Sequence, residues 1–176
     1  MIFIVIIVII LLFSFSSNPK KRPINNMNNC YSYAFNIMNR YKKKPQPGEF
    51  SNIKPINSEK KYKCGYYVKR VLSDNPNARF ITVDSYKNGS KCDTDETSIF
   101  LAIDDTGKSK DYHFYKKEPN ERYWSHKPGI GYIRKFDSDD VLITNPLTAN
   151  RDYEKKDTNN KHKWNYSKPC GFFCNK

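Results

Sequence analysis

An unbroken apolar run opens the chain. Positions 2–13 hold only Ile, Val, Leu and Phe, and positions 14–17 hold only Ser and Phe, so residues 1–17 form one hydrophobic segment. A membrane-spanning helix usually needs about 20 residues and a signal-peptide core fewer, so this length suits both a membrane anchor and an export signal. The basic residues 18–28, rich in Pro and Asn, indicate a linker. Residues 29–176 then form a single globular domain of ordinary size.

The residues at the end of the hydrophobic segment are compatible with two different fates, a membrane anchor and a cleaved export signal. Lys20, Lys21 and Arg22 follow it at once, and the positive-inside tendency then favours a single-pass N-terminal anchor, with the domain on the cytoplasmic side or inside a membrane-bounded particle such as a virion. Ser14 and Ser16 are small and suitably spaced for signal cleavage, which would give a secreted protein. We expect the membrane anchor, with secretion as the alternative.

Two stretches with a helical apolar period follow the linker. The first spans residues 29–41, begins at an asparagine that can cap it and places Cys30 in its first turn. The second spans residues 62–72, and Asp74-Asn75-Pro76 stops it. The side chains that share the apolar face of the second stretch are Tyr67, Val68, Val71 and Leu72.

Strand patterns dominate the second half of the chain. They cover residues 79–83, 97–103, 111–116, 122–125 and 141–144. The stretch from Pro146 to Lys168 is polar and poorly periodic, which indicates a long loop, and the residues after it look like a terminal strand or turn. This order predicts an α+β fold: an N-terminal hydrophobic helix, then two helices packed on a small antiparallel sheet.

The amino-acid composition limits the classes of partner that are expected. The 31 Lys and Arg residues outweigh 18 Asp and Glu residues, and the net charge of +13 favours contact with anionic surfaces. The lysine runs lack interleaved aromatic residues and no nucleic-acid motif is present, so no specific nucleic acid is expected. Membrane lipid beside the anchor is one expected partner. The 13 Tyr and 11 Phe residues predict protein partners at an aromatic surface. The bias toward Asn, Lys, Tyr and Ile is compatible with a large DNA virus.

Five cysteines occupy positions 30, 64, 92, 170 and 174. In an oxidising compartment four of them can pair, and the pairs are expected among the last four because Cys30 lies in the first helix. In the cytosol all five can remain thiols. Cys170 and Cys174 have C-x3-C spacing, but no second close pair completes a tetrahedral zinc set. We therefore expect no metal and no cofactor.

Cys30 is the strongest candidate for a reactive side chain. The first turn of a helix favours a thiolate, because unpaired N–H groups and the positive end of the helix dipole lie there. A nucleophilic thiol also needs a base, and histidine is the usual one. His113 lies within a strand pattern and shares its face with Asp111 and Tyr115, and His126 follows on the next strand. His162 lies between two lysines and is read as a surface residue.

This order of elements resembles the papain-like superfamily, especially its NlpC-type and CHAP-type peptidases and amidases. The resemblance covers roughly residues 29–144: a cysteine at the start of the first core helix, a histidine in the antiparallel sheet and a polar residue on the following strand. It implies a papain-like fold in which Cys30 attacks a carbonyl, His113 acts as the base and His126 orients the ring, with Asn145 as a substitute for this third residue. Backbone N–H groups near Cys30 would bind the oxyanion.

Two functions from different classes are consistent with these features. The first is a membrane-anchored papain-like thiol hydrolase that cleaves a peptide, amide or ester bond, which requires Cys30 and His113 to meet below an open cleft. The second is a non-enzymatic, membrane-anchored assembly protein, such as a minor virion or capsid protein that ties a shell to the underlying membrane. In the second case Cys30 is buried or disulfide-bonded. Charge and anchor suit both functions equally.

Overall fold

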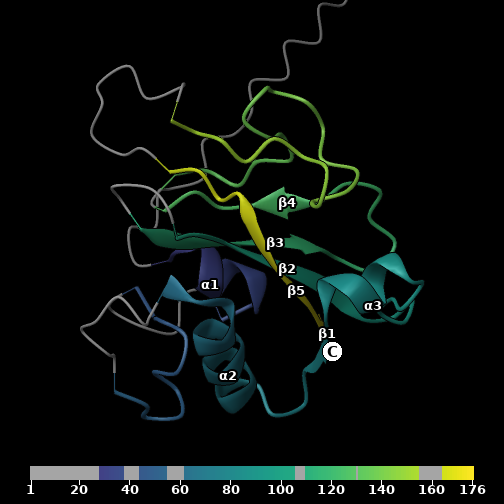
Figure 1. Ribbon diagram of the computed structural model, residues 1–176. Coiled ribbons are helices and arrows are strands. Elements are labelled where there is room, and N and C mark those ends of the chain that lie inside the picture. Colours follow the sequence, from purple (N-terminus) through teal and green to yellow (C-terminus); the bar gives the residue numbers. More distant parts are fainter. Residues whose placement is uncertain (1–27, 38–43, 55–61, 106–109, 130, 155–163) are drawn as a thin grey trace, which may run out of the picture.

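The computed structural model describes residues 28–37, 44–54, 62–105, 110–129, 131–154 and 164–176 (Figure 1). The hydrophobic segment 1–17 and all but the last residue of the linker 18–28 lie outside these ranges. In the part of the chain that is described, no helix combines the length and the apolar character needed to cross a bilayer. The expected transmembrane helix is therefore not found among the described residues.

A five-stranded antiparallel sheet organises the chain, with the strand order β1-β5-β2-β3-β4. The strands are β1 (Arg79–Ile81), β2 (Thr97–Asp104), β3 (Asp111–Lys117), β4 (Ser125–His126) and β5 (Lys168–Asn175). The last strand of the chain lies between β1 and β2 and pairs with both, so the C-terminal residues are central to the sheet. β3 pairs with β2 along its whole length but with β4 over two residues only.

In the described part of the chain, three helices accompany the sheet: α1 (Cys30–Ala34), α2 (Cys64–Asp74) and α3 (Val83–Lys87). The expected cap of α1 is confirmed. The Asn29 side chain accepts a hydrogen bond from the Ser32 backbone N–H at 3.0 Å, and the Ser32 hydroxyl accepts one from the Asn29 N–H at 2.9 Å. The helix ends at Ala34, earlier than expected, because Asn36 adopts a left-handed conformation with φ of 56°.

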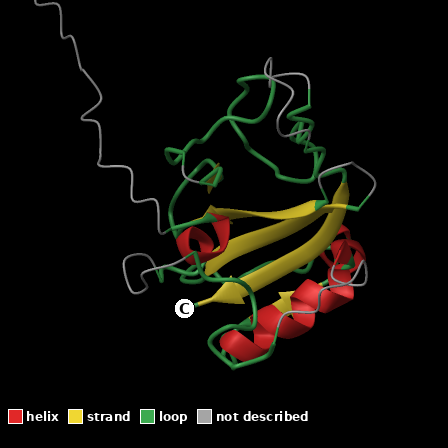
Figure 2. Ribbon diagram, turned by 90° about the vertical axis from the view of Figure 1, so that its left-hand side faces the viewer, coloured by secondary structure: helices red, strands yellow, loops and turns green. Residues whose placement is uncertain are grey.

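The two faces of the sheet are covered by different kinds of structure (Figure 2). On the helix-covered face, α1 and α2 pack against alternate side chains of β2, β3 and β5. On the loop-covered face, α3 and residues from the long connections 118–167 pack against the other set. Because side chains alternate along a strand, neighbours on β5 separate: Phe173 lies on the helix-covered face and Phe172 on the loop-covered face.

Two disulfides attach other segments to β5. Cys64–Cys170 links it to α2, and Cys92–Cys174 links it to the residues that precede β2. These are the four cysteines that were expected to pair, and Cys30 is free and buried. The bridges join residues 106 and 82 positions apart, loop lengths for which the chain-entropy estimate gives about 4.5 to 5 kcal/mol each when taken singly.

The predicted fold, an N-terminal hydrophobic helix followed by two helices on a small papain-like sheet, is wrong. A five-stranded antiparallel sheet carries the described structure and the helices are few. The main error concerns residues 170–174, which were predicted to form a terminal strand or turn and instead belong to β5, in the interior of the sheet. Residues 141–144 form only an isolated bridge between Leu142 and Phe136. The position of β5 depends on long-range strand pairing, which local patterns do not determine.

Candidate functional site

Cys30 meets the edge of β3 at the backbone on either side of His113. β4 pairs with β3 only at Tyr115 and Lys116, so the beginning of β3 has no strand beyond it on that side. The start of α1 meets this edge, and the Cys30 thiol donates a hydrogen bond to the carbonyl oxygen of Tyr112, with Sγ and O 3.9 Å apart. Tyr112 immediately precedes His113. A residue of the first helix thereby contacts the backbone of a residue 82 positions later in the chain.

A cavity of about 510 Å³ opens where α1, β3 and β4 meet. Cys30, His113 and His126, the three residues proposed from the sequence, all line it. The other lining residues are Asn29, Lys44, Gln46, Asp111, Tyr112, Pro128, Gly129, Tyr153, Trp164 and Tyr166. Residues from six separate stretches of sequence therefore converge on one space, and most of its walls are aromatic or apolar side chains.

Asn145, the substitute third residue, lies elsewhere. Its side-chain oxygen accepts a hydrogen bond from the Leu147 N–H at 3.0 Å, so it organises a turn. It is not among the residues that line the cavity. His162 lies outside the described residues.

A chain of hydrogen bonds determines the tautomers of the two histidines. His126 Nε2 lies 3.0 Å from the carbonyl oxygen of Phe136, which can only accept, so this nitrogen carries the proton. His126 Nδ1 is then an acceptor, and it lies 2.8 Å from Nε2 of His113, which must donate. The remaining nitrogen of His113, Nδ1, is unprotonated. His113 can therefore accept a proton at Nδ1 while His126 holds its other nitrogen.

Burial keeps all three groups uncharged at neutral pH. It raises the pKa of the Cys30 thiol to about 12, and the nearby Asp111 carboxylate adds to the rise. Burial also lowers the pKa of His113 well below its ordinary value, with a further decrease from His126, and lowers the pKa of His126 to about 4. The expected thiolate at the first helical turn is wrong, because desolvation outweighs the stabilisation by backbone N–H groups.

Two residues that support the site were missed by the sequence analysis. The Tyr166 hydroxyl donates to the Asp111 carboxylate at 2.9 Å, and its ring stacks on His113 with centroids 5.0 Å apart. The Lys127 ammonium donates to the carbonyl oxygens of Asn28 at 2.9 Å and Gly129 at 2.7 Å, and only 6% of this residue is exposed. Tyr166 lies within the stretch 146–168 that was predicted to be a polar loop, and Lys127 is one of many lysines, so no local pattern marked either residue.

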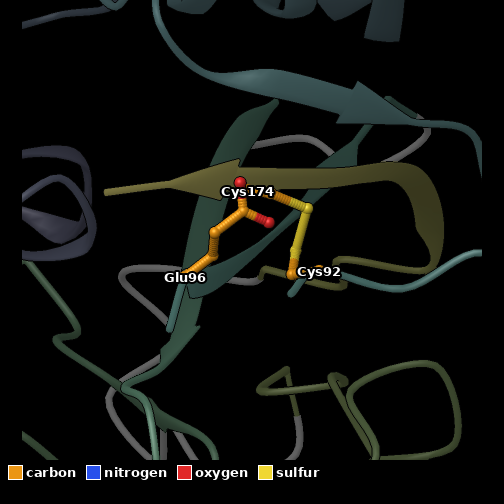
Figure 3. A group of neighbouring side chains, drawn as sticks. All are labelled: Cys92, Glu96 and Cys174. Carbon is orange, nitrogen blue, oxygen red and sulfur yellow. A yellow bond between two sulfur atoms is a disulfide. The ribbon is translucent and has the colours of Figure 1, made fainter. Parts of the chain in front are cut away.

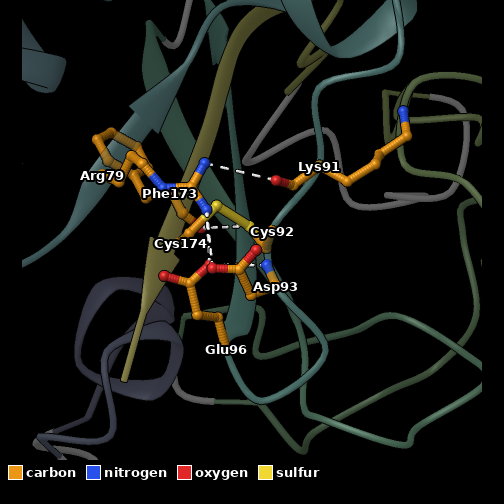
Figure 4. Close-up of a disulfide and its surroundings, with 7 residues drawn as sticks. All are labelled: Arg79, Lys91, Cys92, Asp93, Glu96, Phe173 and Cys174. Carbon is orange, nitrogen blue, oxygen red and sulfur yellow. Dashed lines mark hydrogen bonds and ion pairs between the residues drawn. A yellow bond between two sulfur atoms is a disulfide. The ribbon is translucent and has the colours of Figure 1, made fainter.

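A second cluster with metal-ligating atoms lies at the end of β5. The sulfur atoms of Cys92 and Cys174 and a carboxylate oxygen of Glu96 lie within 4.8 Å of one another (Figure 3). The two sulfurs are bonded to each other, however, and a disulfide offers no thiolate to a metal. Glu96 accepts hydrogen bonds from Arg79 and from the Asp93 N–H, each at 2.8 Å (Figure 4). The cluster is therefore a crosslink reinforced by an ion pair.

Comparison with known proteins gives one informative similarity. No protein-family model matches the chain, and no solved structure matches it. Insoluble matrix shell protein 1 of Ruditapes philippinarum is 32% identical over 133 residues, which cover 73% of this chain and 74% of that protein. The expected viral protein held by a single-pass anchor, in a virion membrane or capsid, is therefore wrong: the similar protein is a shell matrix protein, and no described helix can cross a membrane.

Proposed function

Because the chain belongs to the same family as insoluble matrix shell protein 1 of Ruditapes philippinarum, we propose that it is a secreted matrix protein that carries a thiol hydrolase site for an amide or ester bond. One observation carries the hydrolase proposal: Cys30, His113 and His126 line one cavity, and the hydrogen-bond chain leaves His113 Nδ1 unprotonated. The two disulfides support export, because such bonds persist in oxidising compartments. The hydrophobic residues 1–17 would then be the export signal.

The reaction starts from a neutral thiol and a neutral imidazole. As the Cys30 sulfur bonds to the substrate carbonyl carbon, its proton moves to His113 Nδ1, so the charged pair forms only during attack. The thiol must first leave the Tyr112 carbonyl, its present acceptor. The imidazolium of His113 then gives the proton to the departing amine or alcohol, and a thioester remains on Cys30. Water, activated by His113, hydrolyses this thioester and restores the thiol.

His126 assists the reaction through His113. Its Nδ1 accepts the hydrogen bond from His113 Nε2, which fixes the ring and favours the imidazolium that forms during attack. The Phe136 carbonyl in turn holds the proton on His126 Nε2. An asparagine could accept the same bond, so His126→Asn is expected to keep more activity than His126→Ala.

A non-catalytic matrix protein is the second candidate. Two observations favour it: the matrix name of the similar protein, and a resting Cys30 that is 6% exposed and bonded to a backbone carbonyl. In that case Cys30 is a buried core thiol and the cavity has no chemical role.

The deciding experiment is hydrolysis of a panel of p-nitrophenyl esters and p-nitroanilides by the disulfide-bonded protein. We expect turnover that falls by at least about 1,000-fold in Cys30→Ala and in His113→Ala, since nucleophile and base act as a unit. The rate should hold below pH 6.5, because the base has a lowered pKa and stays unprotonated there. Tyr132→Ala is the control, since this residue is 49% exposed and lies outside the cavity. Absence of turnover, or turnover indifferent to Cys30→Ala, would leave the non-catalytic matrix protein as the function.

A further inference from the structure

An aromatic ribbon forms one wall of the cavity. Two segments near the C-terminus pair through an antiparallel bridge between Asp152 and Asn165, and the Tyr153 N–H donates to the Trp164 carbonyl at 2.9 Å. Residues directly across such a bridge, and alternate residues along it, share a face. Tyr153, Trp164 and Tyr166 therefore lie on the same face, and all three line the cavity. We call these three residues the aromatic wall.

Buried polar contacts hold this wall in place. The Arg151 guanidinium donates to the carbonyl oxygens of Tyr166 and Ala149, at 2.9 and 3.3 Å, and also to the carbonyl of Pro146. Arg151 is itself buried, so these bonds are shielded from water. Tyr166 contacts His113 by stacking, which connects the wall directly to the proposed base. The wall is therefore preorganised, and a bound group would lose little energy in ordering it.

The cavity is electrically balanced although the chain is strongly basic. Of the described residues that line it, only Lys44 and Asp111 carry charge at neutral pH, and their charges are opposite. Burial keeps both histidines neutral, as their lowered pKa values show. A charged substrate group would thus gain no net attraction from the lining residues. A volume of about 510 Å³ with predominantly aromatic walls suits a medium-sized neutral, apolar group.

We propose that the aromatic wall binds an apolar acyl group, so that the substrate is an ester or amide of an apolar carboxylic acid. The inference rests on the proposed hydrolase function, since it assigns the acyl side of the bond that Cys30 attacks. Trp164 is the specificity-determining residue, because it is the largest side chain of the wall, lines the cavity and is only partly buried by the protein.

The kinetic test compares two esters that differ only in the acyl group, p-nitrophenyl hexanoate and p-nitrophenyl acetate. The hexanoate has four more methylenes, and we expect its kcat/KM to exceed that of the acetate by about 10-fold or more. Trp164→Ala should reduce the hexanoate rate constant by about 10-fold and that of the acetate by less than about twofold. Trp164→Phe should retain most of the preference, and Tyr132→Ala all of it. Equal rate constants for the two esters, or a preference that survives Trp164→Ala, would overturn the inference while hydrolysis itself stands.

A binding test separates the inference from the hydrolase function. In a Cys30→Ala, Trp124→Phe variant, Trp164 is the remaining tryptophan, and its fluorescence can report occupancy of the wall. We expect hexanamide to shift its emission with a Kd at least about 10-fold lower than that of acetamide. Binding of hexanamide without ester turnover by the wild type would overturn the hydrolase function and retain the apolar site. Equal affinities for the two amides, or no emission change with hexanamide, would overturn the apolar site.

Discussion

On the helix-covered face, α1 and α2 satisfy most of their backbone hydrogen bonds internally, and Arg70 and Asp74 of α2 serve the adjoining loop 47–54. On the loop-covered face, most of the covering segments are irregular and depend on buried side chains that they carry themselves. Ring contacts occur on both faces, such as Phe35 against Phe173 on the first and Tyr86 against Phe172 on the second. On the second face the carboxylate of Asp137 accepts from three backbone N–H groups and Arg151 donates to three carbonyls. Buried backbone groups need partners, and irregular segments obtain them from side chains.

The candidate site lies where these two kinds of structure meet. Cys30 belongs to the helix-covered cluster, while Tyr115 and Tyr166, the neighbours of His113, belong to the loop-covered cluster. The position of the thiol therefore depends on apolar packing, and the position of the histidines depends on hydrogen bonds in loops. Substitutions on either face should affect the site. On the helix-covered face they act by removing apolar packing, and on the loop-covered face they act by removing hydrogen bonds, with a dependence on pH through the histidines.

The largest effect is expected from the two adjacent phenylalanines of β5, which are both fully buried but face opposite sides. Phe173→Ala should lower the free energy of unfolding by about 4 kcal/mol, because helices cannot readily close the resulting cavity. Phe172→Ala should cost about 3 kcal/mol, because the loops around it can partly collapse. Urea unfolding of both variants measures the difference. An equal or larger loss in Phe172→Ala would show that the loop-covered face is as rigid as the helix-covered one.

Acid should weaken the loop-covered face selectively. The pKa of His126 is about 4 in the folded protein and about 6.5 when unfolded, so below pH 6.5 the unfolded state binds the proton more readily. The contribution of His126 to the free energy of unfolding is fully present above pH 6.5 and is lost as the pH decreases to about 4. The loss amounts to about 3 kcal/mol. The pKa of His113 is also lowered, so protonation of His113 destabilises the folded protein in the same way. Unfolding measured across this range should be visibly less steep in His126→Asn. A slope identical to that of the wild type would contradict the assigned burial.

The smallest of these effects concerns the hydrogen bonds of the loops. Asp137→Ala removes the acceptor for the N–H groups of Asp139, Val141 and Asn150, and we expect a loss of about 2 kcal/mol. Ester hydrolysis should also fall, because the adjacent Phe136 carbonyl holds His126. Asp139→Ala is the matched control. Its carboxylate bonds an exposed Asn150 side chain, so a loss below about 0.5 kcal/mol is expected, and similar losses in both variants would refute the role given to Asp137.

Local patterns located some elements and missed their assembly. The cap at Asn29 and the start of a helix at Cys30 follow from side chains a few residues apart, and the structure contains both. The end of α1 was missed because Asn36 was not recognised as a left-handed residue. Four cysteines were singled out for pairing, but four cysteines allow three connectivities, and only the central position of β5 selects Cys64–Cys170 and Cys92–Cys174.

By itself, the sequence determined which residues were candidates for reactive side chains. These are Cys30 at the start of a helix and His113 on a strand, on the face that it shares with Asp111 and Tyr115. The tertiary structure alone decided that Cys30, His113 and His126 share a cavity, that His113 Nδ1 is the free acceptor and that the thiol is neutral. The tertiary structure also decided which residues form the aromatic wall. Helix starts and strand faces depend on neighbouring residues, whereas tautomers, desolvation and cavity walls depend on groups brought together from distant positions by strand pairing and loop hydrogen bonds.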